Sequence, residues 1–336
     1  MGVAIFCVAA CGHNSSSQAA ASSASTTAAS AAATPQAPAI PASEVAPPPS
    51  QTGGFDGAAA YRFTSQLVAF GPRPPASDNI RRTQEFVIAQ LKSFGCPAVD
   101  TDEFHANTPA GSVAMKNIVA KIPGSGQGII LLLTHYDTDT VTPAGQHMDN
   151  FVGADDGGSS SGLLLEIARI LCGDKTRQPN SVWIAFLDGE EAFVDWNANN
   201  DNTYGSRQMA ASMAESGELK RVKAVLLADM VGPIGLRIRR DESSTPWLTN
   251  LVWKNAERLG YQDIFVAQSA GPISDDHLPF TKRNIPSVDV IDLVDAPVTS
   301  YWHTPQDTMD KISPRSLAIV GHVFMASIAE LQQKFR

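Results

Sequence analysis

Apolar residues recur along the chain in two patterns, and together they predict alternating strands and helices. Five short runs bounded by turn residues are continuously apolar, which is typical of strands covered on both faces: 117–122, 128–134, 182–187, 223–229 and 287–291. Other stretches carry apolar residues at helical spacing: 78–94, 160–171, 204–213, 246–259 and a last segment from Ser313-Pro314, an N-cap followed by proline. Alternation of this kind predicts an α/β fold, a three-layer α/β/α sandwich with a mixed, largely parallel central sheet.

The first 54 residues have a different character. Residues 1–11 are apolar and end in Val8-Ala9-Ala10-Cys11, a pattern typical of a lipoprotein signal segment, although the usual charged start is missing. Residues 12–54 are mostly Ala, Ser, Thr, Pro and Gln, with Glu44 as the only Asp, Glu, Lys or Arg, which predicts a disordered tether. We therefore expect an exported periplasmic or cell-envelope lipoprotein, anchored only through Cys11, with a catalytic domain over 55–336. A short apolar segment without a targeting role is the alternative for residues 1–11.

Charge and cysteine content narrow the classes of protein. The formal net charge is −9 and the basic residues are scattered, which argues against a nucleic-acid-binding protein. No internal repeat is visible, and we expect a monomer. Outside the signal segment only Cys96 and Cys172 remain. They could form a disulfide in an oxidising compartment, or remain as two buried thiols.

Polar residues follow the predicted strands at the ends where the active site of a parallel sheet lies. His135 and Asp137 follow one strand, the pair Glu190-Glu191 another, and Asp229 ends a third. Two adjacent glutamates repel each other unless a cation or protons compensate. Imidazole and carboxylate together are zinc ligands, and a catalytic site needs three of them with a position left open. Asp156, Glu191 and His303 could form that set, although Asp155-Asp156 alone could be N-terminal charge on a helix.

The other histidines that stand alone in the sequence, His105, His147 and His322, are interpreted as solvated or capping residues.

A series of motifs gives these residues a family. The chain reads "THYDT", "GADDGGSSSGLLLEIAR", "FLDGEEAFVDW", "DNTYGSR", "DDHLPF" and "WHT" in this order. This series resembles the animal-type, zinc-dependent glutaminyl cyclases, which are related to the co-catalytic zinc aminopeptidases. The resemblance begins near "FGPRPPAS" and covers almost all of the predicted domain.

The resemblance implies a role for each matching residue. It makes Asp156, Glu191 and His303 the ligands of one zinc ion, and Glu190 the general acid and base. Asp229 and Asp275 become supporting carboxylates, while Trp196, Ile273 and Trp302 form the substrate pocket. His135 matches a residue that binds a second metal in the aminopeptidases and is unliganded in the cyclases. Animal cyclases have a histidine where this chain has Asp289, which puts the pH optimum and the rate in doubt.

The function that the resemblance implies is cyclisation of N-terminal glutamine on peptides to pyroglutamate, with release of ammonia. A two-zinc aminopeptidase is the second hypothesis, because every aminopeptidase ligand is present. The tryptophans Trp196 and Trp302 weigh against it. A binding module that has lost catalysis is the third, and it would lack a ligand or Glu190, yet the sequence has both.

Overall fold

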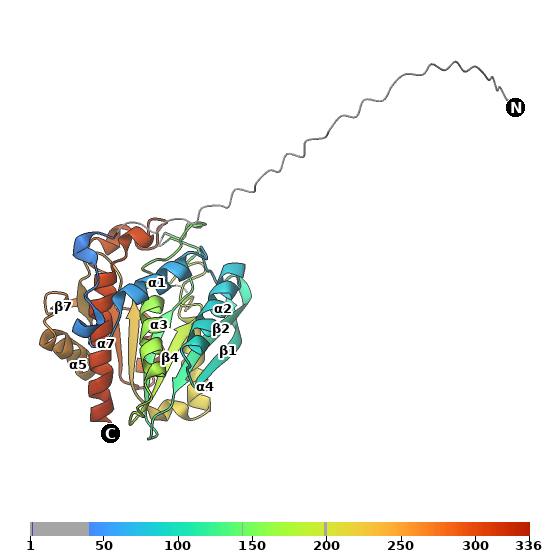
Figure 1. The fold of residues 1–336 in the computed structure, drawn as a ribbon. Helices are drawn as coiled ribbons and strands as arrows, with labels where there is room; N and C mark the ends of the chain where they lie inside the picture. The colour runs from blue at the N-terminus through green and yellow to red at the C-terminus, as the bar shows by residue number, and fades with distance from the viewer. Residues whose placement is uncertain (1, 3–39, 143, 198–199) are drawn as a thin grey trace, which may run out of the picture. The chain divides into compact units, whose positions relative to one another are not determined.

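The computed structural model describes residues 2, 40–142, 144–197 and 200–336, and it confirms the predicted three-layer α/β/α class (Figure 1). The central sheet has the strand order β1-β2-β4-β3-β5-β8. Its strands are β1 (Ala98–Thr108), β2 (Gly111–Ile122), β3 (Ile129–His135), β4 (Ser181–Leu187), β5 (Val222–Asp229) and β8 (Ser287–Ile291). Strands β4, β3, β5 and β8 are parallel, whereas β1 and β2 form an antiparallel hairpin at one edge.

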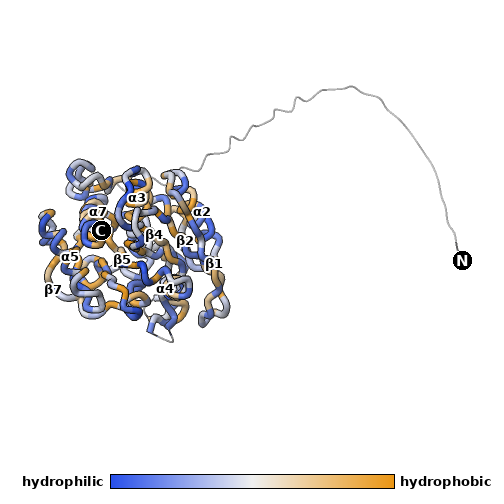
Figure 2. The backbone as a smooth tube through the Cα atoms, turned by 90° about the horizontal axis from the view of Figure 1, so that it is seen from below, coloured by the Kyte–Doolittle hydropathy of each residue, from blue (hydrophilic) through white to orange (hydrophobic). Residues whose placement is uncertain are grey.

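Alternate residues of the strands pack into two separate apolar cores. Ile130 and Leu132 of β3 face one layer of helices, while Leu131 and Leu133 face the other. The first layer contains α1 (Gly57–Val68), α2 (Asp78–Ser93), α3 (Gly158–Gly173), α5 (Pro246–Arg258) and α7 (Pro314–Lys334). The second contains α4 (Tyr204–Glu215) and α6 (Leu278–Thr281). In Figure 2 the apolar stretches lie mainly inside the fold, between the helices. Both faces of the sheet are covered, which explains the continuously apolar strands.

All five predicted strands and all five predicted helices are present, but the sequence patterns missed several elements. The missed elements are α1, α6, the edge strand β1, and a separate parallel pair formed by β6 (Ile238–Asp241) and β7 (Phe265–Gly271). Strand β1 carries several charged residues that are solvent-exposed, as is usual for an edge strand. No continuous apolar run marks such a strand.

Residues 40–54 are ordered against the domain, so the predicted tether extends too far along the chain. They include two short 3₁₀ helices, η1 (Ala42–Glu44) and η2 (Pro49–Gln51). Ser313, the N-cap of α7, donates a hydrogen bond of 2.6 Å to the Glu44 carboxylate. The hydroxyl of Thr52 is buried and donates to the carbonyl of Phe55. Composition alone predicted a tether here, because single polar contacts of this kind leave no trace in the amino-acid composition. The signal segment and most of the tether lie outside the described residues.

Deleting residues 40–54 is therefore expected to destabilise the domain. A chain that begins at Phe55 loses the Glu44 contact to Ser313, and a hydrogen bond to a charged group contributes about 1.5–3 kcal/mol. The melting temperature should fall by about 2–4 °C for each kcal/mol, measured against a chain that begins at Ile40. Glu44→Ala in the longer chain should reproduce part of the loss. Equal melting temperatures of the two truncated chains would contradict the prediction.

Cys96 and Cys172 form a disulfide, which decides between the two alternatives left open by the sequence. The bond joins the segment after α2 to the last turn of α3. No helix within the described residues is both long enough and apolar enough to cross a lipid bilayer.

Candidate active site

The polar residues at the strand ends converge at one edge of the sheet. His135 ends β3, Asp229 ends β5, and Glu190 and Glu191 follow β4 directly. Asp156 lies just before α3. All five side chains are buried. The sheet topology therefore brings together residues that are far apart in the sequence.

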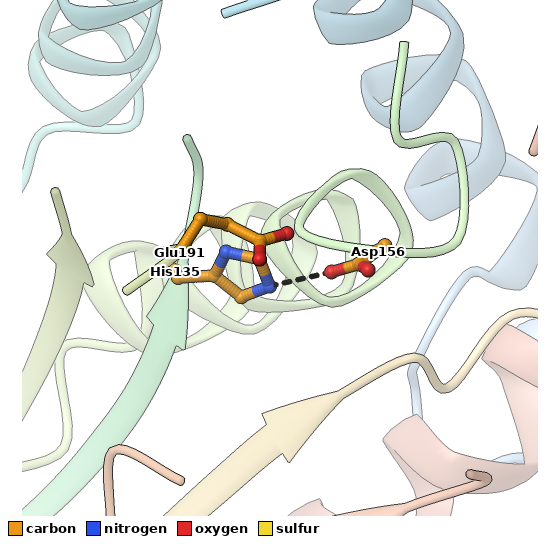
Figure 3. Close-up of side chains that lie close together, drawn as sticks. All are labelled: His135, Asp156 and Glu191. Carbon is orange, nitrogen blue, oxygen red and sulfur yellow. Dashed lines mark ion pairs between the residues drawn. The ribbon is translucent and has the colours of Figure 1, made fainter. Parts of the chain in front are cut away.

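Asp156 lies between two histidines and faces each with a different oxygen. Its Oδ1 is 3.1 Å from Nε2 of His135, and its Oδ2 is 3.3 Å from Nε2 of His303. Figure 3 shows the Asp156 carboxylate facing the His135 imidazole, with Glu191 beside the ring. Nε2 of His135 also lies 3.2 Å from Oδ1 of Asp229. Asp156 can therefore contribute one oxygen to an ion-binding position next to His135 and the other to a position next to His303.

His303 reaches the site from an irregular segment after β8. Its Nε2 lies 3.4 Å from Oε2 of Glu191, and its Nδ1 lies 3.3 Å from Oδ2 of Asp139. The backbone of His303 has φ = +48°, a left-handed conformation that costs energy for a residue with a side chain. Such strain is common at functional sites, where the surroundings hold a side chain in one direction.

The donor set around Asp156, Glu191 and His303 fits a divalent cation. The oxygens Oδ2 of Asp156 and Oε1 and Oε2 of Glu191 are buried and accept no hydrogen bond from the described residues. His303 Nε2 is near two of them but is not aligned to donate to them. Buried carboxylate oxygens without donors are costly, and a metal ion would satisfy them. Two groups that share Glu191 have ligand atoms within 4.8 Å of one another: His135, Asp156 and Glu191 form one, and Asp139, Glu191 and His303 form the other.

The charges of the site shift the pKa values in opposite directions. Burial, and then repulsion from Asp156, raises the pKa of Glu191 well above its usual value. Burial also raises the pKa of Glu190, and the neighbouring Glu191 adds to the shift. Burial opposes ionisation of Asp156, but the close approach of the His135 and His303 imidazoles outweighs it and holds the pKa of Asp156 below the usual range. The site therefore contains one aspartate that stays ionised, and two glutamates whose negative charge needs a cation or a proton beside it.

Three aspartates without an assigned role in the sequence analysis hold the site in place. The Asp137 carboxylate accepts hydrogen bonds from the backbone N–H groups of both Glu190 and Glu191, at 3.1 and 3.2 Å. The Asp307 carboxylate accepts from the backbone N–H of Asp156 at 3.1 Å. Asp139 faces Nδ1 of His303, and a carboxylate in this position fixes the direction of the imidazole ring. The sequence offered a signal only for Asp137 and Asp139, which follow β3, and none for Asp307.

Gly157 and Arg73 shape the turn that carries Asp156. Gly157 has φ = +72°, and a Cβ there would lie 2.9 Å from Cε1 of His135, so no other residue fits. The guanidinium of Arg73 is almost fully buried and donates to the carbonyls of Tyr136, Val152 and Gly153. Burial lowers the pKa of Arg73 to about 10. These contacts join the end of β3 to the segment before Asp156.

A cavity of about 490 Å³ adjoins the candidate ion-binding cluster of Asp156, Glu191 and His303. It contains eight of the ten residues that the sequence predicts for the site: Asp156, Glu190, Trp196, Asp229, Ile273, Asp275, Trp302 and His303. Glu191 and His135 are buried and do not line it. The Trp302 ring lies 4.3 Å from the His303 ring, measured between centroids. The cavity therefore has an apolar side, which includes Trp302 and Ile273, next to its acidic residues.

Asp275, which lines the cavity, and Asp289, which does not, belong to one buried acidic group. Burial, and then the charge of Asp289, raises the pKa of Asp275 well above its usual value. His277 is fully buried between two aspartates, with Nε2 at 3.2 Å from Asp241 and Nδ1 at 3.9 Å from Asp289. Asp289 thus has an imidazole beside it, contributed by a residue that had no predicted role.

The three isolated histidines lie away from the cavity lining and from the candidate ion-binding groups. His147 pairs with Asp149 at the surface, His322 contacts the Tyr261 hydroxyl, and His105 is exposed in β1.

Comparisons of the sequence and of the structure with known proteins agree on the relatives of this chain. Residues 117–328 match the model of peptidase family M28. A mouse protein named glutaminyl-peptide cyclotransferase-like protein is 30% identical over 281 residues, covering 77% of this chain and 72% of the mouse protein. A solved structure of an Acidobacteriales bacterium glutaminyl cyclase is 38% identical, with a TM-score of 0.77, covering 91% of this chain and 100% of that one. A Zn-dependent exopeptidase from Parabacteroides distasonis is 28% identical, with a TM-score of 0.73, covering 81% and 97%.

Proposed function

The chain belongs to peptidase family M28, and we propose that it is a glutaminyl cyclase of this family, which converts N-terminal glutamine of peptides to pyroglutamate and releases ammonia. The observation that carries the proposal is the cavity of about 490 Å³ that joins Glu190 and the ion-binding cluster to an apolar wall containing Trp196 and Trp302. A small, partly apolar pocket suits one glutamine side chain. The 38% identity to a solved bacterial glutaminyl cyclase supports the same activity.

We assign Asp156, Glu191 and His303 as ligands of one zinc ion per chain. Carboxylate and imidazole are common zinc ligands, and three protein ligands leave a position for substrate. The orphaned oxygens of Glu191 and Asp156 support this set. The chemistry that a bound zinc ion supplies here is Lewis-acid polarisation of the side-chain amide.

Glu190 is the residue that moves the proton. The α-amine nitrogen attacks the side-chain amide carbon, a new C–N bond closes the ring, and the original C–N bond breaks to release ammonia. Glu190 takes the proton that the α-amine loses and gives it to the departing nitrogen. Asp137 holds the backbone of Glu190 in position, and Glu190 itself lines the cavity.

Asp229 and Asp275 support this transfer from the cavity floor. Both carboxyls line the cavity, and the charge of Asp229 contributes to the raised pKa of Asp275, which favours a protonated Asp275 beside an ionised Asp229. Ile273 and the two tryptophans keep water from the reacting carbon, which favours attack by the amine over hydrolysis.

A two-zinc aminopeptidase is the second candidate, because a specific contact favours it. His135 lies 3.1 Å from Asp156 and 3.2 Å from Asp229, an arrangement that could hold a second ion. In the cyclase proposal a proton on Nε2 of His135 occupies that position and bonds to the carboxylates.

We also propose that the protein acts outside the cytoplasm. A disulfide between Cys96 and Cys172 persists in an oxidising compartment, which agrees with the export predicted from residues 1–11. A lipid anchor at Cys11 and a monomeric state complete this proposal.

Two peptides that differ only in the first residue distinguish the candidates. We expect a peptide with N-terminal glutamine to lose ammonia, detected by mass spectrometry, while its N-terminal alanine counterpart stays intact. An aminopeptidase would release the first amino acid from the alanine peptide instead. A binding module would leave both peptides unchanged.

A further inference from the structure

A second hollow of about 360 Å³ adjoins the catalytic cavity. Trp196, Asn197 and Ser274 line both spaces, so the two are adjacent and share part of their walls. The other walls come from the segment before α4 and from α6 with the residues that follow it. None of the roles assigned above uses this hollow.

The two adjoining spaces carry opposite charge. The catalytic cavity is lined by acidic side chains, whereas the charged residues of the second hollow are all basic: Arg207, Lys282 and Arg283. Among the residues that the structure describes, none of these three has a carboxylate oxygen within 4.0 Å. Three unpaired cations are therefore gathered in one small hollow of a chain with net charge −9.

Two of the basic groups are held by contacts with uncharged groups, while the more distant Asp201 and Asp276 attract Arg207 electrostatically. Arg207 donates to the carbonyls of Thr203 and Asn202, and its guanidinium lies 4.6 Å from the centroid of the Tyr204 ring. Arg283 donates to the carbonyl of Pro279 at 2.8 Å. Carbonyl contacts fix the direction of a guanidinium but do not cancel its charge. An anion bound in the hollow would thus meet positioned cations.

We propose that this hollow is the subsite for acidic side chains that follow the N-terminal glutamine of the substrate. The proposal rests on the proposed cyclase function, in which the glutamine side chain fills the catalytic cavity. The rest of the peptide must then leave through the cavity mouth. One extended residue spans about 3.3–3.6 Å, so the second and third residues can enter a space that adjoins the cavity.

Peptide preference measures this subsite directly. Three peptides that begin with glutamine are compared by kcat/KM at low ionic strength, with Glu-Glu, Ala-Ala or Lys-Lys in the next two positions. Exposed ion pairs are weak, and two of them together correspond to roughly 2- to 30-fold. We expect the parent enzyme to prefer the Glu-Glu peptide to the Lys-Lys peptide by such a factor. The preference should shrink as salt screens the charges.

A charge-reversed double variant and a matched control show whether the peptide preference arises from this hollow. Lys282→Glu with Arg283→Glu should abolish or invert the preference, with the Ala-Ala peptide as the internal reference for each variant. Lys220→Glu with Lys254→Glu changes net charge equally at exposed residues outside both spaces, and it should keep the parent preference. The subsite proposal is wrong if the peptide preference changes equally in both double variants, or if it changes in neither. If none of the three peptides is cyclised by the parent enzyme, the proposed function itself fails.

Discussion

Replacing Glu190 with glutamine is expected to lower kcat by about 10²–10⁴-fold, because general acid–base catalysis contributes a factor of this size. The amide is nearly isosteric, but it cannot accept the proton from the α-amine. Asp137 bonds to the backbone of residue 190 and not to its side chain, so the local structure should survive. The substrate can still enter the cavity, so KM should change little. Steady-state kinetics together with the zinc content of the purified variant checks both parts of the prediction.

Glu191→Gln is the matched control, since it alters the adjacent residue in the same way. Glu191 provides buried oxygens to the ion-binding cluster, so this variant should bind zinc more weakly and recover part of its activity at high zinc. If Glu190→Gln loses zinc while Glu191→Gln keeps it, the two roles are exchanged. If both variants cyclise glutamine at the parent rate, the active site lies elsewhere.

Removing zinc is expected to abolish cyclisation, and adding zinc back should restore it. A chelator leaves the acidic cluster of Asp156, Glu191 and His303 without its cation, and the amide carbonyl of the substrate then lacks a Lewis acid. His303→Ala should have the same consequence, with loss of bound zinc. Elemental analysis of the parent protein is expected to give one zinc ion per chain.

His135→Asn tests the second position beside Asp156. In a one-zinc cyclase this variant should keep its zinc ion, because His135 only bonds to Asp156 and Asp229. Two tightly bound ions in the parent, with one lost in His135→Asn, would instead identify a two-zinc enzyme.

The sequence predicted the layers of the fold because strands and helices were marked by apolar periodicity. Strands β3, β4 and β5 are buried on both faces and stand out as continuous apolar runs. Strand β1 does not, because it lies at the sheet edge and carries charged residues. The pair β6 and β7 lies outside the main sheet; β6 has only four residues, and β7 is exposed along its middle.

The sequence also indicated where the site lies, since parallel strands bring their carboxyl ends to one edge. It could not indicate which carboxylates accept hydrogen bonds from backbone N–H groups. Asp137 and Asp307 accept N–H groups from residues up to 152 positions away, and no spacing rule encodes such a contact. The same limit applied to Cys96 and Cys172, which are separated by 76 residues. Pairings between distant segments appear only once the sheet order is known.

The disulfide also determines what a single proteolytic cut can do to this enzyme. The edge hairpin of β1 and β2 lies between the two cysteines, as do His135 and Asp156, whereas Glu191 and His303 lie outside this covalent loop. A cut anywhere between Cys96 and Cys172 therefore leaves both fragments joined in one molecule. After a nick in the hairpin, all four of these residues lie on the C-terminal fragment, and the disulfide keeps the N-terminal fragment, with α1, α2 and the buried Arg73, attached to them. The hairpin exposed at the sheet edge can therefore be cleaved without releasing the part of the chain that holds Arg73 beside the site.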